Sequence, residues 1–215
     1  MMKKYWKLLV ITSIIIILPI VAGLLFWDQL PDRVPIHWNV AGEVDGWSGK
    51  PFAVFGLPLI MLAVQWLCCL VTAADPKKAN HGDKVIQLVL WILPVMTVAL
   101  SMVTYSTAFG KPIPMEVVMP LLTGLLFAVI GNYLPKCKQN YTIGIKLPWT
   151  LNSEENWNKT HRLAGGIWLV CGLLIMLSGI LGFFWSGTFW VMLGMTPVMV
   201  FVPVGYSYGL HRKGV

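Results

Sequence analysis

Residues 8–27 read LLVITSIIIILPIVAGLLFW, a run of apolar side chains without a single charge. A helix needs about 20 apolar residues to cross the hydrocarbon core of a bilayer, so the run predicts a first membrane span over roughly residues 7–27. A secretory signal peptide has a shorter apolar core, of about 7–15 residues, and then small residues at a cleavage site. Because this run ends in Phe26 and Trp27, we interpret it as a span that stays in the membrane.

The rest of the chain repeats this pattern. Hydrophobic residues make up 57% of the sequence and charged residues 12%, about half the charged share of a soluble domain. This composition excludes a soluble protein and a disordered chain. Together with the first run, five further apolar runs predict an all-α membrane protein with about six transmembrane helices; they lie at residues 52–73, 85–109, 115–133, 163–184 and 188–210.

The orientation follows from the basic residues of the connecting segments. With the N-terminus inside, the inner segments hold 13 of the Lys and Arg residues and the outer segments hold three: Arg33, Lys50 and Lys111. This asymmetry predicts that both termini are cytoplasmic. The net charge of +7 is then mainly a topology signal that also suits contact with anionic membrane lipids. We expect no direct binding of nucleic acid, because no basic helix stands apart from the membrane.

The predicted spans contain almost no ionisable residue. A transporter coupled to protons or sodium usually places a carboxylate or a histidine near the middle of the membrane. Here the main polar residue deep in a span is Gln65, and Ser and Thr residues gather towards the outer end of the third span. We expect these side chains to form hydrogen bonds between helices.

Two connecting segments are long enough to carry function: an outer loop at residues 28–51 and an inner loop at residues 134–162. In the outer loop, Ile36, Trp38 and Val40 alternate with polar residues, as in a short strand, and turn residues follow. We therefore expect the outer loop to be compact and ordered. A metal or catalytic site built from His37, Asn39, Glu43 and Asp45 is an alternative, although their spacing matches no metal motif.

The inner loop begins at Pro135, which ends the fourth span. Residues 141–149 look extended, with a bend at Gly144 and Pro148 closing the segment. Asn152 or Ser153 is expected to cap a helix that runs into the fifth span. This loop is either an interfacial helix with basic anchors or a cytoplasmic docking surface, since its Trp, Tyr, Asn and basic residues are typical of interfaces.

The four cysteines indicate no cofactor or metal site. Cys68, Cys69 and Cys171 lie in apolar runs and Cys137 in a polar loop, and none forms a Cys-x-x-Cys pair. We therefore expect no bound metal, no cofactor and no catalytic residue.

Both loops also resemble known families. LPDRVPIHWN at residues 30–39, followed by GEVDGW at 42–47, resembles the domain of unknown function DUF1648. NYTIGIKLPWTL at residues 140–151, followed by WNKTHR at 157–162, resembles the SdpI family. The resemblance divides the chain into a DUF1648-like region at residues 1–75 and an SdpI-like region at residues 84–215.

The resemblance implies an immunity protein of the bacterial cell membrane that protects against a secreted peptide toxin. It also implies a signalling role, in which the protein holds a cytoplasmic transcriptional repressor at the membrane. We expect toxin contacts on the outer loop at Pro35, His37, Trp38, Asn39, Glu43, Asp45 and Trp47. We expect repressor docking on the inner loop at Asn140, Tyr141, Gly144, Lys146, Pro148, Trp149, Ser153, Glu154, Trp157, Lys159, His161 and Arg162.

Two other functions stay open at this point. One is a membrane enzyme that uses His37 and Asp45 outside, or Glu155 and His161 inside. The other is a transporter of a small molecule or a lipid.

Overall fold

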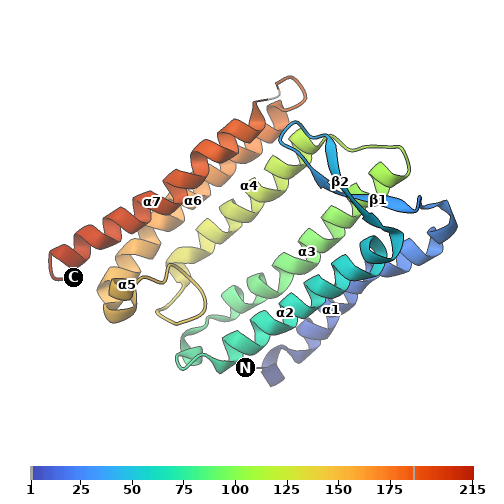
Figure 1. Cartoon of the computed structure of the whole chain (residues 1–215). Coiled ribbons are helices and arrows are strands. Elements are labelled where there is room, and N and C mark those ends of the chain that lie inside the picture. Colours follow the sequence, from blue (N-terminus) through green and yellow to red (C-terminus); the bar gives the residue numbers. More distant parts are fainter. Residues whose placement is uncertain (1, 186) are drawn as a thin grey trace. The chain divides into compact units, whose positions relative to one another are not determined.

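The computed structural model of the protein describes residues 2–185 and 187–215 and is mainly helical (Figure 1). Six of the described helices are long and apolar enough to cross a membrane. The chain is therefore a multi-pass membrane protein, and the predicted all-α architecture with about six spans is confirmed. The orientation, with both termini inside, stays a prediction.

The helices follow the predicted runs closely along the chain. The long helices are α1 (Met2–Leu25), α2 (Leu57–Ala74), α3 (Asp83–Ala108), α4 (Met115–Tyr133), α6 (Glu154–Leu181) and α7 (Thr188–Arg212). The shorter elements are α5 (Pro148–Asn152), a π-helical turn at Phe52–Gly56, and 3-10 turns at Trp27–Gln29, Lys78–Asn80 and Leu134–Lys136. Two strands, β1 (Arg33–Trp38) and β2 (Val44–Gly49), complete the described structure.

The fifth spanning helix begins earlier than the apolar run. Helix α6 starts at Glu154, whereas the run starts at about residue 163. The Ser153 hydroxyl accepts a hydrogen bond from the backbone N–H of Asn156, so Ser153 is the N-cap. The prediction of a capped helix that continues into the fifth span is confirmed.

The chain forms two compact units, and each is built from two separate stretches. Unit 1 contains the residues up to Leu70 together with Gln87–Met115, and unit 2 contains Val71–Ile86 and Glu116–Val215. Helices α2 and α3 each contribute residues to both units. The boundary predicted from the family resemblance, between residues 75 and 84, stays a prediction.

Unit 1 is held together by polar and apolar contacts between its helices. The Gln65 amide donates to the Thr12 hydroxyl over 2.9 Å, so Gln65 makes the predicted helix–helix hydrogen bond. The Tyr105 hydroxyl donates to the Pro19 carbonyl oxygen over 2.9 Å, and thereby connects α3 to α1. A buried apolar cluster lies beside the outer loop and consists of Ile20, Leu30 and Val54.

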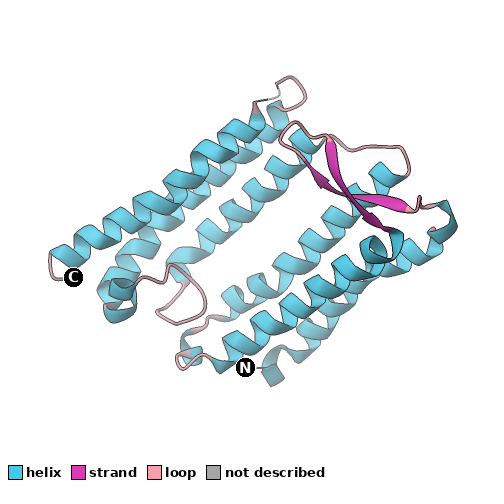
Figure 2. Cartoon of the chain, in the orientation of Figure 1, coloured by secondary structure: helices cyan, strands magenta, loops and turns pink. Residues whose placement is uncertain are grey.

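The outer loop folds into an antiparallel β-hairpin, which is drawn in magenta in Figure 2. Arg33 pairs with Gly49 at the open end of the hairpin, and Trp38 pairs with Val44 near the turn. The expectation of an ordered loop is met. The strand-like segment expected from Ile36 to Val40 is met in part, because β1 ends at Trp38 and Val40 lies in the turn. The alternating pattern did not indicate β2, because Gly46 and Gly49 interrupt it.

Unit 2 packs α4, α6 and α7 at short range. A Cβ atom added to Gly172 of α6 would lie 2.4 Å from the backbone nitrogen of Ala128 in α4, so only glycine permits this approach. Gly165 likewise faces Gly131 and Pro135, whereas a Cβ atom on Gly166 would meet no described residue within 4 Å. Gly165 and Gly172 of α6 therefore serve packing within the chain.

Candidate functional site

The hairpin turn is fixed by the side chain of Asn39. Its carbonyl oxygen accepts hydrogen bonds from the backbone N–H groups of Ala41, over 2.9 Å, and Glu43, over 3.0 Å. Gly42 has a φ of 77°, a conformation that glycine adopts without steric cost. The turn is thus built from short-range interactions that its own residues supply.

The exposed face of the hairpin carries paired polar groups. His37 Nδ1 lies 2.5 Å from Asp45 Oδ1, and the two side chains are 70% and 43% exposed. The Asn39 amide donates to Glu43 Oε2 over 3.1 Å. In the described part of the chain, no group of three or more His, Cys, Asp or Glu residues could hold a metal ion. The four residues considered for a metal site therefore form two separate pairs.

The base of the hairpin is anchored by Lys50. Its ammonium group donates to the Trp27 carbonyl oxygen over 3.0 Å and lies 5.1 Å from the centre of the Trp27 ring. Pro35 is buried, Trp38 is half-buried, and Trp47 is 52% exposed. Of the predicted toxin contacts, the hairpin thus presents His37, Glu43, Asp45 and Trp47 to the surroundings.

Asn140 organises the irregular part of the inner loop from within. Its side-chain amide donates to the carbonyl oxygens of Lys138 and Ile143, each over 2.8 Å. Its side-chain oxygen accepts from the backbone N–H groups of Thr142 and Ile143. One buried side chain therefore replaces the backbone pairing that a helix or strand would provide.

Trp157 and His161 form a buried stack under the loop, as their spacing on one helix face predicts. Their ring centres are 4.0 Å apart and the planes differ by 19°. Trp157 Nε1–H donates to the Cys137 carbonyl oxygen over 2.7 Å. His161 Nε2 lies 2.9 Å from the backbone N–H of Ile145, which can only donate, so this nitrogen carries no proton. The other ring nitrogen then donates to the Trp157 carbonyl oxygen over 2.8 Å.

This assignment makes His161 a neutral structural residue. Both of its ring nitrogens are engaged with backbone groups, and its side chain is 1% exposed. Glu155, the other inner residue considered for catalysis, forms an exposed ion pair with Lys159 over 2.6 Å. Glu155 and His161 are thus held by different partners.

Pro148 begins a helix, which corrects the predicted extended segment over residues 141–149. Proline suits the first position of a helix because its missing N–H has no partner there and its φ is already helical. The Thr150 hydroxyl accepts from the Leu147 backbone N–H over 2.8 Å and stabilises the start of α5. The segment before Pro148 is irregular, and Gly144 adopts a φ of 124°.

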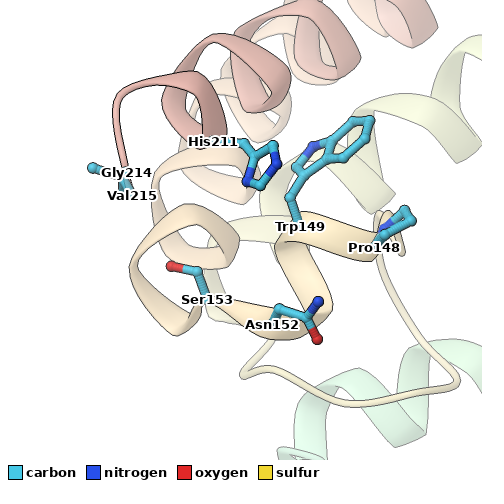
Figure 3. Close-up of a pocket in the computed structure, with 7 residues that line it drawn as sticks. All are labelled: Pro148, Trp149, Asn152, Ser153, His211, Gly214 and Val215. Atoms are coloured by element: carbon cyan, nitrogen blue, oxygen red, sulfur yellow. The ribbon is translucent and has the colours of Figure 1, made fainter.

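Helix α5 borders an open pocket of about 440 Å³ at one end of α7 (Figure 3). The indole ring of Trp149 stacks on His211, with ring centres 5.8 Å apart and planes 16° apart. The ring of Tyr208 packs on the same indole, with ring centres 5.5 Å apart. The Trp149 indole N–H is buried and has no hydrogen-bond partner among the described residues. The pocket is lined by Pro148, Trp149, Asn152, Ser153, His211, Gly214 and Val215.

A second segment of unit 2, the turn between α2 and α3, forms hydrogen bonds with the inner loop. We name residues 75–81 the α2–α3 turn. The Asp75 carboxylate accepts from the Tyr141 backbone N–H and the Thr142 hydroxyl, each over 2.9 Å, and from the Lys77 backbone N–H over 2.7 Å. His81 Nε2 lies 3.3 Å from the same carboxylate. The side chains of Asp75 and His81 are 0% and 1% exposed.

The α2–α3 turn makes further contacts through Gln139. The Lys77 ammonium group donates a hydrogen bond to the Gln139 side-chain oxygen. The Asn80 side-chain amide donates one to the Gln139 backbone carbonyl oxygen over 2.7 Å. The Gln139 amide in turn donates to the carbonyl oxygens of Thr150 and Leu151. The role of these residues was not predictable from the sequence, because Asp75, Lys77 and His81 lie in a short polar segment that looks like an ordinary connection between two spans.

The electrostatics of the turn favour a charged Asp75 and a neutral His81 at neutral pH. Burial raises the pKa of Asp75, but hydrogen bonds from Lys77, Thr142 and Tyr141 outweigh burial and leave it below its usual value. Burial lowers the pKa of His81, and the nearby Asp75 carboxylate only partly offsets this shift. Asp75 is therefore a buried anion that several N–H and O–H donors stabilise.

Comparisons with known proteins support the family resemblance that the two loops carry. Residues 136–207 match the model of the SdpI/YfhL protein family, and residues 14–62 match the model of the domain of unknown function DUF1648. The chain is 24% identical to Immunity protein SdpI of Bacillus subtilis (strain 168), over 95% of this chain and 96% of the relative. The resemblance to the SdpI family is confirmed. No solved structure matches the chain.

The matched segments contain the two ordered loops. The DUF1648 match includes the whole hairpin, and the SdpI match begins at Lys136 and includes the rest of the inner loop.

The predicted docking residues of the inner loop fall into two sets by their burial. Asn140, Trp157 and His161 are buried and Gly144, Trp149 and Ser153 are half-buried, so they mainly shape the loop. The exposed residues are Tyr141, Lys146, Pro148, Glu154, Lys159 and Arg162.

Proposed function

We propose that this protein is a non-enzymatic immunity protein of the bacterial cell membrane, which protects against a secreted, membrane-active peptide toxin. The observation that carries the proposal is the similarity to Immunity protein SdpI along 95% of the chain. In support, six described helices are long and apolar enough to cross a membrane, and a membrane-active toxin would act on that membrane.

The hairpin is the part of the protein that we assign to toxin contact. It combines the exposed indole of Trp47 with the paired polar groups of His37 and Asp45. An aromatic side chain with polar neighbours suits recognition of an amphipathic peptide, because the ring supplies apolar contact area and the rim supplies hydrogen bonds. A rigid hairpin also loses little conformational entropy on binding.

The test of immunity is survival of toxin-sensitive cells. Cells that express the protein should keep their membrane potential when challenged with the peptide, whereas control cells should depolarise. Trp47→Ala should weaken protection, and Trp190→Ala, which changes a 67% exposed tryptophan of α7, should leave it unchanged. The proposal fails if cells with verified membrane expression of the natural sequence depolarise as fast as cells that lack the protein.

We further propose that the inner loop docks a cytoplasmic transcriptional repressor when toxin is bound. In support, its exposed residues Tyr141, Lys146 and Arg162 offer an aromatic and cationic surface on a backbone fixed from within. The measurement is membrane localisation of a fluorescently tagged repressor before and after toxin addition. Combined substitution of Tyr141 and Lys146 by alanine should abolish recruitment but preserve protection. Normal recruitment by that variant would refute the assignment.

A further inference from the structure

The α2–α3 turn holds an arrangement that a simple connection between two spans does not need. Asp75 is a fully buried carboxylate, and burying a charge costs free energy unless several donors compensate it. Two of its three donors, the Tyr141 N–H and the Thr142 hydroxyl, belong to the inner loop. Removal of the turn from the loop would therefore take two of the three donors away from the Asp75 carboxylate, and water would have to replace them.

The turn also contacts the part of the inner loop that contains Gln139 and Tyr141. Lys77 binds the Gln139 side chain and lies 5.4 Å from the centre of the Tyr141 ring, so it holds that ring beside the turn. Gln139 connects the turn onward to the carbonyl oxygens of Thr150 and Leu151 in α5. Tyr141 and Lys146, exposed residues of the proposed docking surface, lie between Gln139 and Thr150 in the sequence.

The other end of α2 starts at the hairpin. Strand β2 ends at Gly49, and the π-helical turn Phe52–Gly56 follows Pro51 and leads directly into α2. A π-helical turn contains an extra residue per turn and is a place where a helix can change its register. The Phe52 ring packs over Gly56 at the end of this turn, since a Cβ atom on Gly56 would lie 2.6 Å from the ring. Helix α2 then continues without interruption to Ala74, the residue before Asp75.

We propose that Asp75 is the positioning residue through which the state of the hairpin controls the inner loop. In the clamped arrangement Asp75 holds Tyr141 and Thr142, as in this structure. A register change at the Phe52–Gly56 turn moves α2 and withdraws Asp75 from the loop. The inference rests on the proposed function in taking the hairpin as the ligand-binding surface and the inner loop as the docking surface. A ligand drives the change to the extent that it prefers one arrangement.

The first test measures the clamp itself by hydrogen–deuterium exchange of residues 139–147 in the full-length protein in lipid nanodiscs. Asp75→Asn should accelerate exchange at least tenfold, because its amide nitrogen would face N–H donors. Thr142→Val, which removes one donor and keeps the shape of the side chain, should give a smaller acceleration. The control Glu155→Gln changes an exposed acid of the same unit and should have no effect. Unchanged exchange in both Asp75→Asn and Thr142→Val would overturn the proposal.

The second test measures the coupling with an antibody fragment raised against the hairpin, so it needs neither toxin nor repressor. Binding of the fragment to the natural sequence should change exchange of residues 139–147 at least threefold. The fragment should bind Thr142→Val and Asp75→Asn equally well but produce a smaller change in the first and none in the second. A bound fragment that leaves exchange unchanged in the natural sequence would overturn the proposal. Failure of immunity in cells would leave this result intact, so the two proposals are distinguishable.

Discussion

Single polar side chains give the inner loop its order. The Asn140 side chain forms hydrogen bonds with the backbone groups of a bend, and His161 Nε2 accepts a hydrogen bond from the backbone N–H of Ile145. Loops usually lie on the surface because buried backbone groups need partners. Here side chains from α6 and from the loop provide those partners, so the loop can pack on α6 without regular secondary structure.

Gly144 is the residue where this packing tolerates least change. Its φ of 124° disfavours any other residue, and a Cβ atom would lie 2.5 Å from His161 Nε2 and 2.9 Å from the Trp157 ring. We expect Gly144→Ala to lower the free energy of unfolding by about 3 kcal/mol. Thermal unfolding in detergent measures the effect. Gly82→Ala is the control, since a Cβ atom there would meet no atom of the described residues within 4 Å. Equal unfolding midpoints for both variants would contradict the prediction.

His81 and Asp75 make the clamp sensitive to acid. Burial lowers the pKa of His81 when the turn is clamped to the loop. As the pH falls below about 6.5, His81 is therefore protonated more readily in the open arrangement than in the clamped one, and clamping weakens. The pKa of Asp75 is also lowered, and its contribution is present above about 3.9 and is lost below it. Both shifts therefore act in the same direction.

We expect exchange of residues 139–147, corrected for its intrinsic pH dependence, to accelerate when the pH falls from 7.5 to 5.5. His81→Asn should remove most of this acceleration, because an amide does not titrate in that range. A flat profile in the natural sequence, or an equal slope in His81→Asn, would show that His81 does not control the loop.

At the scale of whole elements, close contact between α4 and α6 positions the inner loop. A Cβ atom on Gly172 would lie 2.4 Å from the backbone nitrogen of Ala128 and 2.6 Å from the carbonyl oxygen of Gly124. Both neighbours are backbone atoms, so the two helices would have to separate. In a membrane, small residues at such contacts replace the hydrophobic driving force that soluble bundles use.

Gly172→Ala should therefore destabilise unit 2 by about 1–3 kcal/mol, the usual cost of overpacking. Gly166→Ala lies on the same helix in open space, and should be neutral or stabilising by up to about 1 kcal/mol. Thermal unfolding of both variants in the same detergent provides the comparison. The prediction is wrong if Gly172→Ala unfolds at the temperature of Gly166→Ala or above it.

At the scale of the whole molecule, the orientation in the membrane determines which loop can meet which partner. The 13 basic residues of the inner segments against three of the outer segments predict a cytoplasmic inner loop. In a chain whose native cysteines are replaced by serine, Val40→Cys should react with a membrane-impermeant maleimide in intact cells. Lys146→Cys should react only after permeabilisation. The opposite pattern would invert the proposed roles of the two loops.

The membrane architecture and most of the local structure follow from patterns along the sequence. Apolar runs predicted the six spans, because a helix is the solution for a single segment that has no water to bond its backbone. The Ser153 cap and the Trp157–His161 pair were also predictable, since both depend on residues within four positions of each other. The hairpin was predictable as an ordered loop, and its second strand was not, because glycines interrupt the alternating pattern.

The role of the α2–α3 turn, and the division of the inner loop into buried and exposed residues, depend on contacts between segments far apart in the sequence. Asp75 and Tyr141 are 66 positions apart, and no pattern along the chain indicates that they meet. Likewise Asn140 looks like a surface residue in the sequence and is buried, because its amide completes backbone groups that folding brings around it. Hydrophobic periodicity reports where a segment lies relative to the membrane, whereas long-range hydrogen bonds depend on which polar segments fold together.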